Sequence, residues 1–192
     1  MQINFMAHPK LVHKTQGFSL IELLIVVAII LIIAAIAIPS MLRSKQNANE
    51  ASAVDNMRTI TTAEAAYSSS FGGNGFASQL GFLGSGAPGT PCDATHACLI
   101  DNSLGCAAEP CLRSGYFFFV MSDAGAAPFF DYAVTATPQT WAKTGSKNFC
   151  AAEDSVLRYE VNGVASKGSA RSAAAACRNS RCCKPDWACL PR

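Results

Sequence analysis

The chain has 192 residues, of which 50% are hydrophobic and only 15% are charged. That length fits one ordinary domain plus an appendage, and it is too short for two full hydrophobic cores. The low charge fraction excludes a disordered polyampholyte, and a formal net charge of +2 is too small to indicate a nucleic-acid-binding protein. Two of the three histidines lie in the first 17 residues, so most histidine-based catalysis and histidine-rich metal sites are nearly excluded.

The N-terminal segment, residues 1–17, is basic: it contains Lys10 and Lys14 but no acidic residue, and it ends at Gly17. A basic stretch before an apolar run stays on the cytoplasmic side of a membrane. An ordinary secretory signal is cut after its hydrophobic stretch, at a site of small residues. An Ala-x-Ala pattern ends at Ala37, so one alternative is a secreted, disulfide-rich binding module released after that residue.

The next 21 residues, 18–38, form an apolar run in which 15 are Phe, Leu, Ile or Val. As a helix this run would be about 31 Å long, enough to cross a bilayer core of about 30 Å. Its large apolar residues favour insertion by roughly 4.5–9 kcal/mol, which exceeds the cost of the acid Glu22 near one end. We therefore predict a membrane helix over residues 18–39.

Glu22 is the one acid in this run, and a carboxylate in a membrane needs an explanation. One interpretation is an interfacial side chain that reaches toward the lipid headgroups. The other is that Glu22 pairs with a cation inside the membrane. The sequence contains no second apolar span to supply a cation, so the partner would lie on the same helix or on another molecule.

The hexapeptide GFSLIE at 17–22, the apolar run after it and the proline that closes the run resemble the N-terminus of type IV pilins and of the pseudopilins of type II secretion. The resemblance covers residues 17 to about 67. It implies that a prepilin peptidase cuts between Gly17 and Phe18 and then methylates the new amine of Phe18. It also implies that Glu22 neutralises the Phe18 amine of a neighbouring subunit during assembly.

The same resemblance implies an α+β fold, in which a long N-terminal helix, half membrane-spanning and half amphipathic, packs against a small antiparallel β-sheet. It implies a precursor in the bacterial inner membrane that becomes part of an extracellular or periplasmic filament, built from copies of the chain and from other pilins. The further expected partners are the peptidase, the assembly platform and its motor; neither enzyme activity nor a cofactor is expected. The residues do not distinguish a type IV pilus subunit from a pseudopilin or a minor, tip-located pilin.

Cleavage after Gly17 would create an ammonium group four residues before Glu22, on the same helix face. Each charge alone is costly in a medium of low dielectric, and pairing offsets that cost. Loss of the leader also removes Lys10 and Lys14, which leaves 13 basic and 13 acidic residues in a processed chain of 175. Charge repulsion therefore does not oppose polymerisation.

Pro39 removes an amide donor, and we expect it to kink the helix rather than end it, because residues 40–69 contain no further proline or glycine. The alternative is a helix that ends at Pro39. An amphipathic half over 40–70 would turn one face toward a core and the other toward solvent. The expected core set is Ala51, Val54, Met57, Ile60, Glu64 and Tyr67, and the expected solvent set is Lys45, Glu50, Asp55 and Arg58.

Residues 71–114 form a Gly- and Cys-rich stretch, which we expect to be an irregular loop with a short helix. Residues 115–166 are expected to form the antiparallel sheet. The predicted strands are Gly115–Met121, Phe130–Thr137, Val156–Val161 and, after an Asn162-Gly163 turn, a brief return strand at Val164–Ser166.

All nine cysteines lie between residues 92 and 189, which indicates disulfides formed in an oxidising compartment. Their spacing favours the local pairs Cys92–Cys98 and Cys106–Cys111. The other five, which share up to two bridges, are Cys150, Cys177, Cys182, Cys183 and Cys189. Because nine is odd, at least one cysteine is free, intermolecular or modified. No two cysteines have the C-x-x-C spacing of zinc sites, so no metal is expected.

The tail, residues 167–192, carries six basic residues against the single acid Asp186. Such a segment can contact DNA phosphates, stack on a base or bind a surface. The side chains that would do so are Arg171, Arg178, Arg181, Lys184 and Trp187. We favour the alternative, a solvated face that pairs with acidic patches on adjacent subunits.

Overall fold

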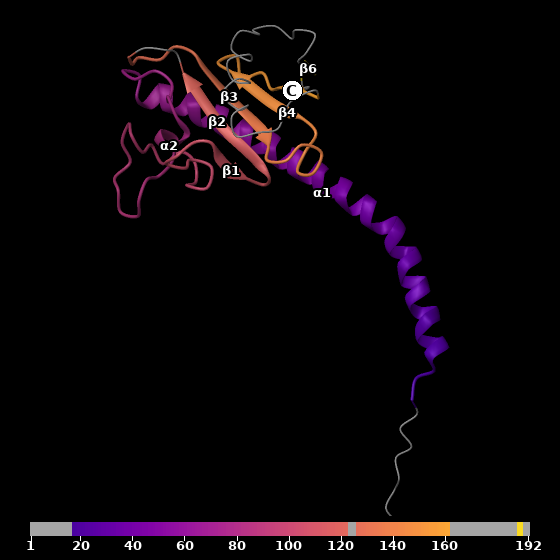
Figure 1. The fold of residues 1–192 in the computed structure, drawn as a ribbon. Helices are drawn as coiled ribbons and strands as arrows, with labels where there is room; N and C mark the ends of the chain where they lie inside the picture. Colours follow the sequence, from indigo (N-terminus) through magenta and orange to yellow (C-terminus); the bar gives the residue numbers. More distant parts are fainter. Residues whose placement is uncertain (1–16, 123–125, 162–187, 190–192) are drawn as a thin grey trace, which may run out of the picture. The chain divides into compact units, whose positions relative to one another are not determined.

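The structure is a computed structural model that describes residues 17–122, 126–161 and 188–189. The chain divides into two compact units, Met1–Ser40 and Met41–Arg192, which share the first helix. The helices are α1 (Leu20–Ser70) and α2 (Leu80–Leu83), and the strands are β1 (Cys111–Arg113), β2 (Tyr116–Ser122), β3 (Tyr132–Pro138), β4 (Asn148–Ala152), β5 (Arg158–Glu160) and β6 (Ala188–Cys189) (Figure 1).

The described part of the first unit is the beginning of α1 and the three residues before it. By length and composition this helix can cross a membrane, and none of its apolar stretch is buried. The helix continues through Pro39, so the alternative that it ends there is wrong. The kink expected at Pro39 stays a prediction.

In the described part of the second unit, six strands form one antiparallel sheet in the order β1-β2-β3-β4-β5-β6, so each strand pairs with the next in sequence. The longest pairing joins β2 to β3 over seven residues, from Tyr116 opposite Pro138 to Ser122 opposite Tyr132. Within this unit the sheet lies against the second half of α1 (Figure 1). The expected α+β fold, a long helix on a small antiparallel sheet, is therefore confirmed.

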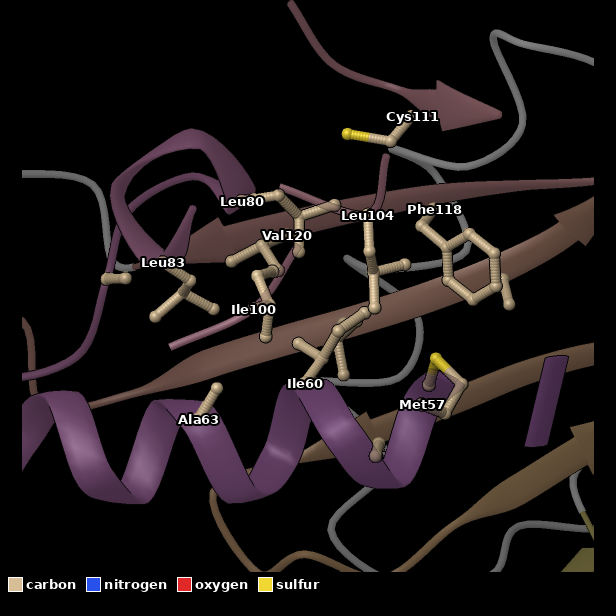
Figure 2. Packing of buried hydrophobic residues seen from close by; sticks show 14 of the residues in the cluster. Met57, Ile60, Ala63, Leu80, Leu83, Ile100, Leu104, Cys111, Phe118 and Val120 are labelled. Carbon is tan, nitrogen blue, oxygen red and sulfur yellow. The ribbon is translucent and has the colours of Figure 1, made fainter. Parts of the chain in front are cut away.

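The hydrophobic core of the second unit lies between α1, α2 and the sheet (Figure 2). Its α1 residues recur at helical spacing, and alternate residues of β2 face them. The large side chains of this core include Met57, Ile60, Tyr67, Leu80, Leu83, Phe118 and Val120. Burial of such side chains stabilises the fold by about 1.5–3 kcal/mol each before the entropy cost of ordering them.

The buried stripe of α1 differs from the predicted one at its beginning. Glu50, expected in solvent, is buried, whereas Ala51, expected in the core, is exposed and Val54 is half-buried. Ala53 and Asn56 are buried instead. The stripe is therefore rotated at this end of the helix, because Glu50 finds polar partners on the sheet side.

The sheet contains three described strands that the sequence did not predict: β1, β4 and β6. Strand β4, with the sequence NFCAA, is buried on both faces and has neither apolar–polar alternation nor β-branched residues. Strand β1 is three residues long and lies inside the stretch expected to be a loop. The predicted return strand at Val164–Ser166 lies outside the described residues; β6 is the strand that pairs with β5.

Candidate assembly site

The junction between Gly17 and Phe18 lies just before α1. Both residues are exposed and neither is helical. The helical hydrogen bonds begin with the N–H of Leu23, which donates to the carbonyl of Ser19 at 3.2 Å. The peptide bond after Gly17 is therefore accessible to a protease without unwinding of the helix.

Glu22 lies in the first turn of α1, where the partial positive charge of the helix N-terminus favours a carboxylate. It makes no ion pair with any cation among the described residues. The side chains around it are apolar and exposed, with Phe18 at 81% and Leu20 at 80%. A lipid environment would thus leave the charge of Glu22 uncompensated by the described part of its own chain.

Comparisons with known proteins find similarity to this segment and to a longer stretch of the chain. The family model of the prokaryotic N-terminal methylation motif matches residues 12–38. The type IV major pilin protein PilA of Myxococcus xanthus (strain DK1622) is 31% identical over 121 residues, which cover 58% of this chain and 54% of that protein. This chain therefore spans about half the length of the curated relative. No solved structure matches it.

The chain carries the prokaryotic N-terminal methylation motif and is similar to a type IV major pilin over part of its length. The matched motif contains Gly17, Phe18 and Glu22, the three residues to which the resemblance assigned processing and assembly. The similar protein is named a major pilin, so the geometry of interest here is that of contacts between subunits. Among the described residues no group of three potential metal ligands occurs.

A polar clamp fixes the sheet to the second half of α1. The carboxylate of Glu50 accepts hydrogen bonds from the backbone N–H of Ser146 at 2.8 Å and from its hydroxyl at 2.9 Å. Lys147 completes the clamp, because its Nζ lies 2.9 Å from the second oxygen of Glu50. Burial alone would raise the pKa of Glu50, but these bonds outweigh it and hold the pKa below its usual value.

A second acid, Glu64, lies fully inside the core. One of its oxygens accepts a hydrogen bond from the N–H of Ala77 at 2.8 Å, and the other has no hydrogen-bond partner among the described residues. The sequence placed Glu64 on the core face but gave no reason for an acid there. The structure shows that it binds the backbone of the segment leading into α2.

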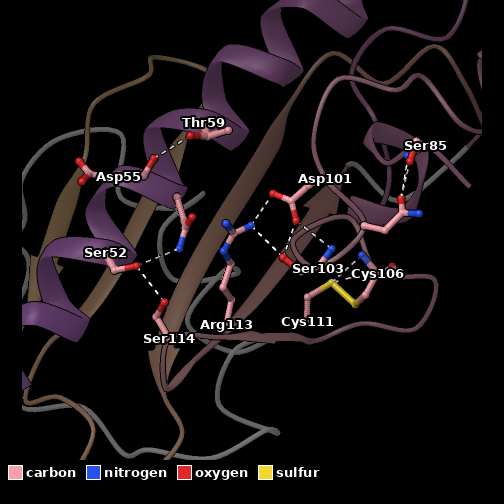
Figure 3. A network of polar contacts seen from close by, with 12 residues as sticks. Ser52, Asp55, Thr59, Ser85, Asp101, Ser103, Cys106, Cys111, Arg113 and Ser114 are labelled. Carbon is pink, nitrogen blue, oxygen red and sulfur yellow. Dashed lines mark hydrogen bonds and ion pairs between the residues drawn. A yellow bond between two sulfur atoms is a disulfide. The ribbon is translucent and has the colours of Figure 1, made fainter. Parts of the chain in front are cut away.

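The four cysteines between residues 92 and 111 form two local disulfides. The structure joins Cys92 to Cys98 and Cys106 to Cys111, the pairs that their spacing favoured. The second bridge lies beside a polar network in which Arg113 donates to Asp101 and, at 2.9 Å, to the hydroxyl of Ser103 (Figure 3). The hydrogen bond from Ser103, followed by that from Arg113, lowers the pKa of Asp101 to about 2.

Cys150 is also disulfide-bonded, and the four described cysteines before it pair with one another. The side chains of Cys177, Cys182, Cys183 and Cys189 lie outside the described residues, and so do the candidate DNA or surface contacts Arg171, Arg178, Arg181, Lys184 and Trp187.

Proposed function

We propose that this pilin is a structural subunit of a type IV pilus or a related filament, cut between Gly17 and Phe18 and methylated on the new amine. The observation that carries the proposal is the exposed apolar surface of α1, which runs from Leu20 to Leu42 with Glu22 as its one acid. A surface of this size is stable in a membrane or beneath other protein copies, but not in water. Transfer of the subunit from membrane to filament supplies both environments in turn.

The pairing of Glu22 with the Phe18 amine of a neighbour gives this assembly its register. Apolar helix surfaces slide past one another with little preference for one axial offset, because dispersion and burial are not directional. An acid and an amine at fixed positions do specify an offset, since both charges are costly when unpaired in low dielectric. The free carboxylate of Glu22 in the described chain is consistent with this role.

The proposal includes the partners that such a pathway needs. They are a prepilin peptidase and a methyl donor at the cytoplasmic face, an assembly platform with its motor in the bacterial inner membrane, and other pilins in the filament. The basic leader supports this orientation of the precursor, because Lys10 and Lys14 favour the cytoplasmic side. The finished filament would be extracellular or periplasmic.

A Gly17→Tyr variant tests the proposal, because a bulky residue at the cut site should leave a full-length precursor in the membrane and no subunit in sheared filaments. Gly73→Ala is a matched control, since a Cβ at Gly73 meets no atom within 4 Å. Mass spectrometry of both fractions should find the control chain in filaments, starting at Phe18. Normal processing of Gly17→Tyr would contradict the assigned site.

A minor or tip-located pilin, or a pseudopilin, is the second candidate role. The similar protein from Myxococcus is named a major pilin, which favours a filament-forming role. The ratio of this chain to other pilins in sheared filaments separates the two: a main subunit dominates the fibre, whereas a minor one is present in trace amounts. Release after Ala37 would instead yield a soluble chain that begins at Ile38.

A further inference from the structure

The loop between β2 and β3 presents an aromatic side chain to solvent. Phe130 is 73% exposed, and the three residues at 126–128 before it are exposed as well. The neighbouring backbone is fixed: the N–H of Phe129 donates to the carbonyl of Asn74, and the N–H of Phe76 donates to the carbonyl of Phe129, both at 2.9 Å. Phe130 is therefore an apolar knob on an anchored loop, which loses little conformational entropy when it is buried by a partner.

A groove of about 340 Å³ lies elsewhere on the same unit, between α1 and the β4–β5 pair. Ala51 and Val54 line its helix side, and Phe149 and Tyr159 line its sheet side. Lys147 lies at its edge, with Nζ 5.8 Å from the centre of the Tyr159 ring. Because Glu50 already satisfies the charge of Lys147, an apolar side chain that enters the groove leaves no charge unpaired.

The knob and the groove lie at opposite ends of this unit. The loop of Phe130 follows the far end of β2 and is bridged to Gly75, beyond the end of α1. The groove adjoins α1 between Asn47 and Val54, so about 24 Å of helix separates its nearest residue from Ser70. A contact between two such different surfaces is heterologous, and repeated heterologous contacts form open filaments unless they close into a ring.

We propose that Phe130 of one subunit inserts into the groove between Val54 and Tyr159 of a second copy of this chain. The inserted ring would meet aromatic and aliphatic walls, and the ammonium group of Lys147 would face it as it faces Tyr159. This contact deepens the proposed filament function and rests on it. It adds a specific contact between globular parts to the pairing of Phe18 with Glu22.

A photo-crosslinking amino acid at position 130 of the full-length chain tests the contact inside assembled filaments. Irradiated, sheared filaments should contain dimers in which position 130 is joined to peptides around Val54 or Tyr159. Dimers joined elsewhere, or filaments that yield no dimer, would overturn the inference while leaving the filament function intact. Absence of the chain from filaments would overturn the proposed function itself, so the two failures are distinguishable.

Two variants change the contact from its two sides. Phe130→Ala removes the knob and Ala51→Trp fills the groove, and Ala51 is exposed, so the fold tolerates the larger side chain. Each should lower the yield of sheared filaments by at least about tenfold at an unchanged level of processed subunit. Leu112→Ala, which truncates another exposed apolar residue at 49% exposure, is the control and should leave the yield unchanged. Equal yields from Phe130→Ala and the control would reject the contact.

Discussion

The buried carboxylate of Glu64 accepts a 2.8 Å hydrogen bond from the backbone N–H of Ala77 and thereby ties α1 to the segment that leads into α2. Burial raises the pKa of Glu64 to about 8, the bond from Ala77 opposes the shift, and the nearby charge of Glu109 adds to it. Glu64 is therefore protonated in the folded chain at neutral pH, which spares the core an unpaired charge.

This raised pKa predicts a pH-dependent stability. The folded state binds a proton that the unfolded state releases above about pH 4.5, so the free energy of unfolding falls as pH rises from about 4.5 to 8 and then levels off. A shift of this size corresponds to a loss on the order of 5 kcal/mol. In Glu64→Gln this pH dependence should disappear. Denaturant unfolding of the detergent-solubilised full-length chain between pH 5 and 9 measures it.

The control for this experiment is Asp55→Asn, since the side chain of Asp55 is 77% exposed. That variant should keep the pH dependence of the unmodified chain. If Glu64→Gln and the unmodified chain lost stability equally between pH 5 and 8, the carboxylate of Glu64 would not be the group responsible.

The clamp at Glu50 predicts a pH dependence of stability opposite in sign to that of Glu64, because folding lowers the pKa of Glu50. Glu50→Ala removes the acceptor for both donors of Ser146 and should lower the free energy of unfolding by about 2 kcal/mol, read from thermal or denaturant unfolding. Because the pKa of Glu50 is lowered on folding, its contribution is present above the ordinary pKa and is lost as pH falls through the folded value.

Lys147→Met is the comparison for the clamp. It removes the partly exposed cation but leaves the bonds from Ser146 to Glu50 in place, so it should cost less than Glu50→Ala. Equal costs would show that the ion pair, and not the backbone and hydroxyl bonds, holds the sheet to the helix.

The sequence predicted most of the architecture, because the long helix and the strands around Phe118, Val134 and Tyr159 have strong local signals. It missed β4, whose five residues are buried on both faces and lack the alternation that reveals a strand. It also placed Glu50 in solvent, because charge alone indicates exposure. The partners that bury this acid come from residues 96 and 97 positions away, and no local pattern encodes that proximity.

The candidate assembly site, unlike β4, has a signal that is local in the sequence. Gly17, Phe18 and Glu22 are adjacent in the sequence, so their pattern is readable without any tertiary structure. By contrast, Phe130 and the groove beside Val54 are identified only from the exposure and topology of the folded chain. Surfaces of this kind carry no sequence motif.

The disulfides predict a specific peptide map. Under non-reducing conditions the exported chain should yield one linked pair for Cys92 with Cys98 and another for Cys106 with Cys111. Cys150 should be linked to one of the later cysteines. A reduced and alkylated sample is the control. Free thiols at Cys92 or Cys106 in the exported protein would contradict both the pairing and the oxidising compartment.

Replacement of Glu22 separates insertion from assembly. Glu22→Val should be inserted and processed normally, because removal of a charge favours the membrane, but its filament yield should fall strongly because the Phe18 amine of the neighbour is left unpaired. Immunoblots of membrane and sheared fractions measure both steps, and Ser19→Ala serves as a neutral change in the same turn. Filaments formed normally by Glu22→Val would contradict the pairing of Glu22 with the Phe18 amine.

The central claim is that this chain enters filaments through a new N-terminus next to Glu22. The most direct test is mass spectrometry of the N-terminal peptide from purified, sheared filaments. We predict a peptide that begins with N-methylated Phe18. A filament subunit that begins at any other residue, or a chain recovered only as a soluble protein starting at Ile38, would contradict the claim.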